Sequence, residues 1–258
     1  MKVLIIYFLI MGFFFNCSEE SNIEPEFQMF SDLVDGELAF SEINIVSFTN
    51  LNGSIYLSGV YRPDTLGYRM AKNVNAVSRE TANAFLADIN FGYFIIDDTL
   101  VCTITYFDVQ KNIQFLGALF VDVPKAMSCY INKAGSVVYS EYLESDIIVN
   151  EANGPIEIKN HKGSIFANTT SGNIAIEAII PVDGFCKALT EDGNIELLIP
   201  LNTSATIYAE TADGIVSFNG LSIENLTQST NKVTGILGSA ESEIHLTTLS
   251  GNIEIIGF

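Results

Sequence analysis

The sequence predicts an all-β fold in which the second half of the chain is a β-solenoid and the N-terminal part contains one short helix. Three observations lead to this fold class. Of the 258 residues, 48% are hydrophobic and only 17% are charged, a composition that supports a sizeable core and excludes a disordered chain. Short segments alternate apolar and polar residues throughout. A glycine turn returns about every 20 residues through the second half of the chain.

The repeat is clearest when the sequence is aligned on the glycine of each turn. These glycines are Gly172, Gly193, Gly214 and Gly251. A serine or aspartate stands directly before each glycine, and apolar residues follow it at alternate positions. A threonine stands three residues before each glycine, at Thr169, Thr190, Thr211 and Thr248. Two turns and two short strands per repeat are typical of one coil of a β-solenoid.

The alternation predicts which residues face outward. Successive side chains of a strand point to opposite faces, so the regular positions are expected inside and the variable ones outside. Coils stack about 4.8 Å apart, and winding in sequence order would make Thr169, Thr190 and Thr211 neighbours on consecutive coils. It would also place Phe166 and Tyr208 in one outward column. Exposed aromatic rings can bind a sugar or a partner protein, so these two are the predicted binding residues.

The rest of the chain divides by composition. The solenoid is expected over residues 129–258, with a polar excursion on one corner at 219–240 that breaks the repeat. Residues 41–128 are predicted to form an N-terminal β-rich part. Within it, residues 79–89 carry an apolar stripe at helical spacing and are preceded by a capping serine, which predicts a helix.

Turn residues predict the strands around that helix. The pair Asn52-Gly53 stands between two alternating segments and indicates a tight hairpin. The pair Asp97-Asp98 indicates a turn between two further strands, and Pro124 is expected to end the strand before it.

The N-terminus begins "MKVLIIYFLIMGFFFNC", an apolar run too short to span a bilayer comfortably. A cysteine directly after such a run resembles a bacterial lipoprotein signal. The resemblance implies that residues 1–17 are a signal peptide with a lipidated Cys17. Residues 18–40 are acidic and carry no sustained period, so we expect them to form a tether. The lipoprotein resemblance further implies a protein of the outer membrane that is exposed on the cell surface and contacts the membrane through its lipid anchor.

Charge and cysteine content restrict the partners and the redox chemistry. The chain has 12 basic and 31 acidic residues and a formal net charge of −19, which excludes a nucleic acid partner because a phosphate backbone would be repelled. Cys102, Cys129 and Cys186 lack the spacing of a zinc or redox motif. We expect buried free thiols, and a Cys102–Cys129 disulfide is the alternative.

Short motifs in order along residues 41–258 resemble one family. "VSFTNLNGSIYLSG", the helix at "ETANAFLADI", "FVDVPK", "TTSGNIAI" and "TTLSGNIEI" are similar to the motifs of adhesin-like repeat proteins of bacterial envelopes. The resemblance implies a fold like a right-handed β-helix and a role in surface interaction, with no established chemistry.

The expected function is therefore an adhesin-like binding scaffold, with no enzyme activity, cofactor or metal. Two alternatives stay open, a polysaccharide-processing enzyme and a purely structural envelope protein. For the enzyme, Asp192 and Asp213 would stack roughly 5 Å apart, but both occupy a position where aspartate stabilises a turn. A cation could bridge Glu191, Asp192, Glu210 and Asp213. His161 and His245 are expected on the outer surface.

Overall fold

The computed structural model describes residues 27–51, 53–105, 114–133, 136–151 and 153–258. The predicted signal peptide and Cys17 lie outside these residues. Within the described ranges no helix has both the length and the apolar character needed to cross a bilayer.

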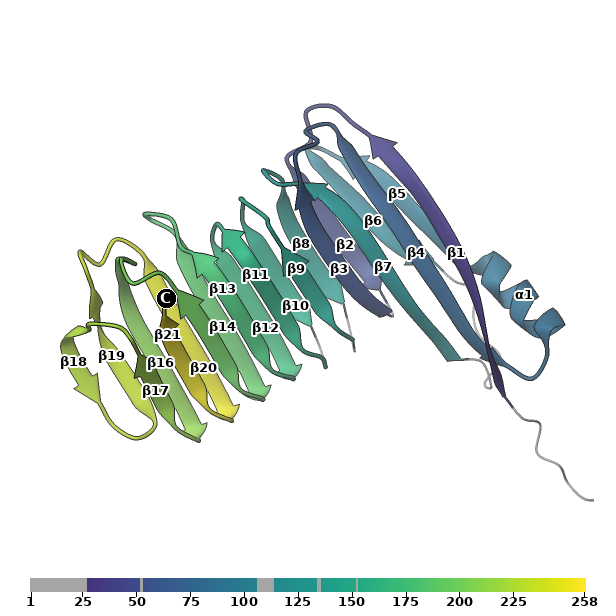
Figure 1. Ribbon diagram of the computed structural model, residues 1–258. Coiled ribbons are helices and arrows are strands. Elements are labelled where there is room, and N and C mark those ends of the chain that lie inside the picture. The colour runs from purple at the N-terminus through teal and green to yellow at the C-terminus, as the bar shows by residue number, and fades with distance from the viewer. Residues whose placement is uncertain (1–26, 52, 106–113, 134–135, 152) are drawn as a thin grey trace, which may run out of the picture.

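Two large sheets face each other along the whole length of the molecule (Figure 1). We call the ten-stranded one sheet A; its strands are, in spatial order, β1 (Gln28–Ala39), β4 (Thr65–Ala76), β7 (Gln114–Pro124), β3 (Gly53–Val60), β9 (Val138–Glu141), β11 (Ile156–Lys162), β13 (Ile174–Ile179), β15 (Ile195–Ile199), β21 (Ile253–Gly257) and β17 (Val216–Asn219). The eleven-stranded sheet B contains, in the same sense, β5 (Asn90–Ile96), β6 (Thr99–Thr105), β2 (Ile45–Leu51), β8 (Ser128–Lys133), β10 (Ile147–Glu151), β12 (Ile165–Ser171), β14 (Phe185–Asp192), β20 (Glu243–Ser250), β16 (Ala205–Asp213), β19 (Lys232–Leu237) and β18 (Glu224–Gln228).

Each coil consists of one strand of sheet B followed by one strand of sheet A, and neighbouring coils pair in parallel. The regular positions of the repeat face the space between the sheets. Ala167, Ala188, Ala209 and Leu246 are all completely buried. The core therefore runs as a narrow layer along the stack, which confirms the predicted solenoid-like fold class.

The coils do not follow one another in sequence order at the C-terminal end. Strand β20 lies between β14 and β16, and β21 lies between β15 and β17. Thr169 and Thr190 are neighbours as predicted, but Thr248 separates Thr190 from Thr211. The prediction that Thr211 stacks directly on Thr190 is therefore wrong. The repeat motif is nearly the same in every coil, so spacing alone does not fix which coil lies next to which.

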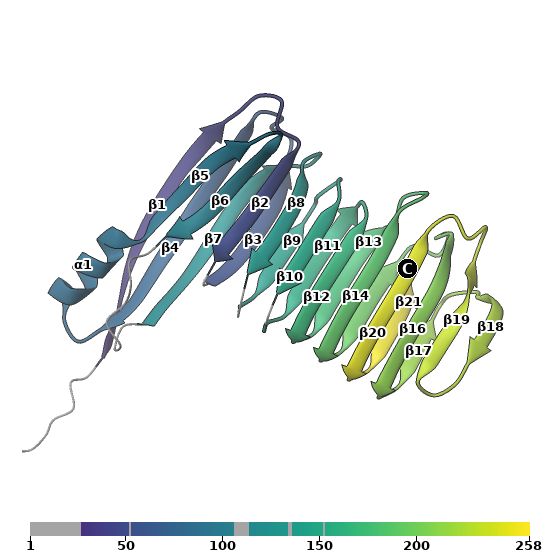
Figure 2. The same cartoon turned by 180° about the vertical axis from the view of Figure 1, so that it is seen from behind.

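The N-terminal end has the same arrangement. The coil β2–β3 lies between β6–β7 and β8–β9 (Figure 2). The hairpin predicted at Asn52-Gly53 is wrong, because β2 and β3 belong to opposite sheets. The predicted boundary between an N-terminal part and the solenoid at residues 128/129 does not divide either sheet. Strand β8, which begins at this boundary, pairs directly with β2 of the N-terminal part. Both the first and the last coil are thus held between two others.

Polar side chains at the corners tie the coils together. The buried hydroxyls of Thr169, Thr190, Thr248 and Thr211 donate to the carbonyls of Gly154, Gly172, Gly193 and Gly251 respectively, each on the neighbouring coil. A Cβ at Gly193 would collide with the carbonyl of Gly172. Glycine is therefore needed at this corner because the backbones approach closely, whereas at Gly172 and Gly251 a positive φ of 148° and 143° adds to that need.

The tether predicted for residues 18–40 is wrong for its second half. Residues 28–39 form β1, which pairs antiparallel with β4. Phe30, Val34 and Leu38 alternate on the face that packs against the core. Apolar residues four apart lie on one face of a strand, and β4, which has the same length as β1, pairs with it along all twelve residues.

The predicted helix is present as α1 (Arg79–Asp88), with the Ser78 side chain capping its start. Its last turn contains no basic residue, but Lys72 from β4 reaches it and donates to the Leu86 carbonyl at 3.0 Å. A buried ammonium at the C-terminal end of a helix donates to a carbonyl that has no partner within the helix, and its positive charge interacts favourably with the negative end of the helix dipole. The hairpin predicted at Asp97-Asp98 joins β5 and β6, and β7 ends at Pro124 as expected.

The excursion at 219–240 contains a strand pair and not simply a polar loop. Strands β18 and β19 form an antiparallel hairpin, and β19 pairs antiparallel with β16. The hairpin extends sheet B beyond β16.

His161 is buried, which corrects its predicted outward position. The register of β11 shifts between Ile158 and His161, and Asn160 has a positive φ of 48°. One extra residue in a strand reverses which side chains point inward. Burial lowers the pKa of His161 to about 4, although the Ser164 backbone and Asp146 oppose the shift. His245 faces outward, as predicted.

The three cysteines of the described chain are free and buried, so the Cys102–Cys129 disulfide is not formed. Burial raises the pKa of Cys102 and Cys186 to about 12 and raises the pKa of Cys129 as well.

Candidate functional site

The two predicted binding residues share one outward row of sheet B but do not touch. Lys187 and His245 lie between Phe166 and Tyr208 in the register of the strands. Both aromatic side chains are partly exposed. The inserted coil therefore interrupts the aromatic column that the sequence predicts.

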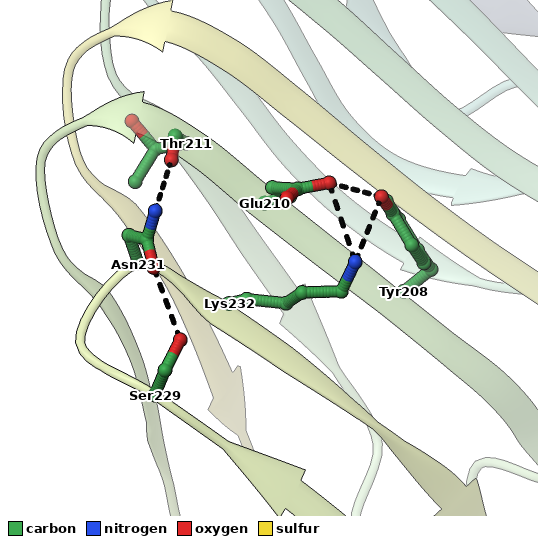
Figure 3. A network of polar contacts seen from close by, with 6 residues as sticks. All are labelled: Tyr208, Glu210, Thr211, Ser229, Asn231 and Lys232. Atoms are coloured by element: carbon green, nitrogen blue, oxygen red, sulfur yellow. Dashed lines mark hydrogen bonds and ion pairs between the residues drawn. The ribbon is translucent and has the colours of Figure 1, made fainter.

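Tyr208 is also committed to contacts within the protein (Figure 3). Its hydroxyl donates to the Glu210 carboxylate and accepts a hydrogen bond from Lys232 Nζ at 3.2 Å. The same ammonium lies 4.5 Å from the centre of the Tyr208 ring. The hydrogen bond from Tyr208, with help from Lys232, holds the pKa of Glu210 below its ordinary value.

The same network fixes the hairpin to the stack. Lys232 is the first residue of β19, and Asn231 directly precedes it. Asn231 Nδ2 donates to the Thr211 carbonyl at 3.1 Å (Figure 3). The ring of His245 packs at 4.7 Å from that of Tyr208. Tyr208 thus fastens β19 to β16, which leaves little of its surface for a ligand.

The acidic turn residues do not form a catalytic or metal site. Ser250 lies between Asp192 and Asp213 in the register, so their Cα atoms are two strand spacings apart, roughly 10 Å. Both side chains are exposed. Within the residues that the structure describes, no three carboxylate, histidine or cysteine groups gather as they would around a metal ion.

A second outward row, on sheet A, brings together aromatic residues that the sequence analysis missed. Phe120 on β7 pairs with Tyr56 on β3, and Tyr56 pairs with Tyr139 on β9. The rings of Phe120 and Tyr56 stack with their centres 4.8 Å apart and their planes at 12°. Phe120 stands at the end of this row and 42% of its surface is exposed.

Beside Phe120 the outer face of sheet A is hollowed, with a volume of about 430 Å³. The strand register explains the shape. Gly67 on β4 lies in register between Glu37 on β1 and Asp122 on β7. Because Gly67 has no side chain, the surface is depressed at this position, and the carboxylates of Glu37 and Asp122 flank the depression. We call this depression the Gly67 hollow.

The next row along the strands supplies the other wall of the Gly67 hollow. Arg69 on β4 lies between Asp35 on β1 and Phe120 on β7. Arg62, from the connection between β3 and β4, closes the hollow with an ion pair to Glu37 at 3.0 Å. Both partners of this pair are more than half exposed, so water screens it and a ligand can replace it at low cost.

A smaller hollow of about 270 Å³ continues from Arg62 toward the corner of the coil. Tyr61 stands there with 85% of its surface exposed. The ammonium of Lys125 lies 4.1 Å from the centre of the Tyr61 ring, and it is also paired with Glu144 at 3.6 Å. Its hydrogen bond with Tyr61, more than the contact with Glu144, raises the pKa of Lys125.

The two hollows combine exposed aromatic rings with both donors and acceptors. Guanidinium groups only donate hydrogen bonds and carboxylates only accept them. Sugar hydroxyls do both, and the apolar face of a sugar ring packs on an aromatic side chain. The sequence gives one signal of this site, since all three arginines of the chain fall within residues 62–79.

Residues 135–256 match the family Toastrack DUF4097. No curated protein matches the sequence. Similar solved structures include a candidate cell adhesion protein of Clostridium sporogenes, which is 12% identical with a TM-score of 0.48 and covers 89% of this chain and 100% of its own. A candidate adhesin of Bacteroides fragilis is 13% identical with a TM-score of 0.36, covering 87% and 97%. Another, from Parabacteroides distasonis, is 10% identical with a TM-score of 0.27, covering 86% and 97%.

Identities near one tenth with these TM-scores do not establish a shared ligand. The family match is the stronger finding, because it covers the coils that carry the glycine repeat. It confirms the resemblance to adhesin-like repeat proteins that the motifs indicate. Residues 135–256, just under half of the chain, are therefore similar to the Toastrack DUF4097 family.

Proposed function

We propose that the protein is a lipid-anchored protein of the cell envelope that binds a neutral glycan in the Gly67 hollow. The observation that supports the proposal most strongly is the register of Glu37, Gly67 and Asp122 beside Arg69 and Phe120. It places acceptors, donors and an aromatic ring around one depression. The apolar run before Cys17 supports the anchor, and the Toastrack repeat supports an adhesin-like scaffold.

Charge favours a neutral sugar over an acidic one. Within the hollow, Asp35, Glu37 and Asp122 oppose Arg62 and Arg69, so carboxylates outnumber guanidinium groups. The chain as a whole has a formal charge of −19. An acidic polysaccharide would meet net repulsion at the site and over the rest of the surface.

The polysaccharide-processing alternative finds no support in the arrangement of Asp192 and Asp213 described above. Glycoside cleavage requires one carboxylic acid in a protected site that keeps it protonated. Glu37, the carboxylate of the hollow that pairs with Arg62, is 66% exposed at its side chain. We therefore propose binding without catalysis.

A filling substitution tests the hollow. A Cβ on Gly67 would make only ordinary contacts, the nearest with Asp122 Cβ at 3.5 Å, so Gly67→Leu should fold while its side chain occupies the floor. The control is Gly92→Leu, because a Cβ on Gly92 also has room, with Thr103 Cγ2 at 3.6 Å. Residues 18–258, which contain all strands and the helix of the described structure, would be applied to immobilised neutral oligosaccharides.

We expect binding to a subset of these oligosaccharides, a loss of at least about tenfold for Gly67→Leu, and unchanged binding for Gly92→Leu. Phe120→Ala should weaken the same interactions. Absence of binding to any oligosaccharide, or equal binding by Gly67→Leu and the unsubstituted chain, would refute the glycan site. A protein recovered from intact cells whose binding depends on the same substitutions would replace the glycan as partner.

The anchor has its own test. Metabolic labelling with a fatty acid should mark the full chain, and Cys17→Ser should abolish the label. Protease added to intact cells should degrade the protein if it faces outward. An unlabelled protein would refute the lipid anchor, and a labelled protein that protease cannot reach would place it on the inner face of the membrane.

A further inference from the structure

The ends of the two sheets leave four edge strands, and three of them carry features that hinder pairing with another chain. Strand β1 contains Asp32, Asp35 and Glu37. Strand β17 has only four residues. Strand β18 is polar, begins with Glu224, and is exposed at every residue. Charge, brevity and polarity are the means by which proteins keep edge strands from associating.

Strand β5 lacks all three features. Its sequence, "NFGYFII", has seven residues and no charge. Four consecutive large apolar side chains are about half exposed, namely Tyr93, Phe94, Ile95 and Ile96. Within the described structure β5 pairs with β6 alone and ends sheet B (Figure 1).

The chemistry of an edge identifies the kind of partner. An edge strand presents unpaired backbone N–H and C=O groups together with its side chains. A bilayer interior could cover the side chains but would leave those backbone groups without hydrogen bonds, which strongly disfavours that environment. A second β-strand satisfies both the backbone and the side chains.

We propose that β5 pairs antiparallel with β5 of a second copy of this chain and forms a two-fold symmetric dimer. In such a pair each residue lies opposite one on the same face of the sheet. Centring the pair on Phe94 places Phe94 opposite its own copy, Ile95 opposite Tyr93, and Ile96 opposite Gly92. Centring it on Tyr93 would instead place Phe94 opposite Gly92 and Ile96 opposite Asn90, so contact between large apolar side chains favours the Phe94 register.

The proposed register can be tested by cross-linking residues 18–258. Opposed residues in an antiparallel pair have Cα atoms about 4.5–5.5 Å apart, within reach of a disulfide. Phe94→Cys should therefore give a disulfide-linked dimer under mild oxidation. Gly92→Cys, on the same face of β5, lies opposite Ile96 and should not. The native cysteines of the described chain are buried, so they do not compete.

Sedimentation of the same protein tests the dimer itself. We expect a dimer that forms more readily at higher salt, because residues 18–258 contain 11 basic and 31 acidic residues, a formal charge of −20 on each copy, and salt screens the repulsion. Ile95→Lys should weaken association at least tenfold. Leu249→Lys should not, because Leu249 is 59% exposed, against 54% for Ile95, but lies on β20, which is paired on both sides.

A monomer at every concentration and salt would overturn the proposal, and so would a dimer that Ile95→Lys leaves intact. Cross-linking through Gly92→Cys as efficient as through Phe94→Cys would overturn the register. Binding to phosphatidylcholine vesicles that is lost in Ile95→Lys, without dimer formation, would assign β5 to the membrane instead.

Discussion

Thr190 pairs in register with Thr248, a residue near the C-terminus, although Thr211 is the next threonine of the repeat. The hydroxyl of Thr248 donates to the Gly193 carbonyl at 2.9 Å. The asparagines that follow the corner glycines show the same order of coils. Asn252 N donates to Asn194 Oδ1 on one neighbouring coil, and Ile215 N on the other neighbouring coil donates to Asn252 Oδ1. The last coil of the chain is thus bound on both of its sides.

Removal of the last coil, β20–β21, should therefore destabilise the coils on both of its sides. A chain that stops at residue 240 loses β20 and β21, which leaves β14, β15, β16 and β17 without their neighbours inside the stack. We expect loss of the cooperative thermal transition of the C-terminal coils, measured by circular dichroism. A truncated chain that melts within a few degrees of the intact one would contradict the insertion.

Thr248→Val should destabilise the fold by about 1–2 kcal/mol, because it leaves the Gly193 carbonyl without its buried donor. Thr247→Val is the matched control. Thr247 points to the opposite face, so its substitution should change the free energy of unfolding by less than about 0.5 kcal/mol. Chemical denaturation measures both, and equal effects would argue against a role for the threonine hydroxyls.

His161 should make the protein sensitive to mild acid. Its folded-state pKa of about 4 lies below the ordinary value of 6.5, so between these pH values the unfolded chain binds a proton that the folded chain does not. The free energy of unfolding should therefore fall as the pH drops below 6.5, by about 2 kcal/mol at pH 5.

Substitution identifies the group responsible for this acid sensitivity. His161→Leu should remove most of the loss of stability between pH 6.5 and pH 5, measured by urea denaturation at each pH. His245→Leu, at the exposed histidine, should leave it in place. If both variants lose stability with acid as the unsubstituted chain does, protonation of His161 is not the cause.

The cysteines should be unreactive in the folded protein. Cys102 and Cys186 have pKa values raised to about 12 by burial, so almost no thiolate exists at neutral pH. A thiol reagent at pH 8 should modify residues 18–258 only after denaturant is added. Rapid reaction of more than one thiol in the native protein would show that the coils open readily.

Much of the stack can be predicted from the sequence because each coil repeats the same local chemistry. Gly193, its preceding aspartate and Thr190 recur in equivalent form, so the inward and outward faces follow from alternation. The order of the coils cannot be predicted in this way. Strand β20 carries the same pattern as β14 and β16, and only tertiary packing decides that it lies between them.

The Gly67 hollow could not be predicted for a different reason. Glu37, Gly67 and Asp122 come from three segments without a shared motif, and antiparallel pairing over long sequence distances brings them together. Phe166 and Tyr208 do belong to the repeat, and their row was predicted. The two residues are separated because the coil β20–β21 is inserted between their strands. Tyr208 fixes β19, and β19 could not be predicted because the composition of residues 219–240 indicates a polar loop.

A pair of cross-linking variants tests the order of the coils most directly. Leu189 and Thr247 are in register on neighbouring strands, as are Thr247 and Glu210, so Leu189 and Glu210 are two strands apart. We predict that cysteines at 189 and 247 form a disulfide detectable by mass spectrometry and that cysteines at 189 and 210 do not. A disulfide between 189 and 210 but not between 189 and 247 would show that the coils follow the sequence and contradict the structure described here.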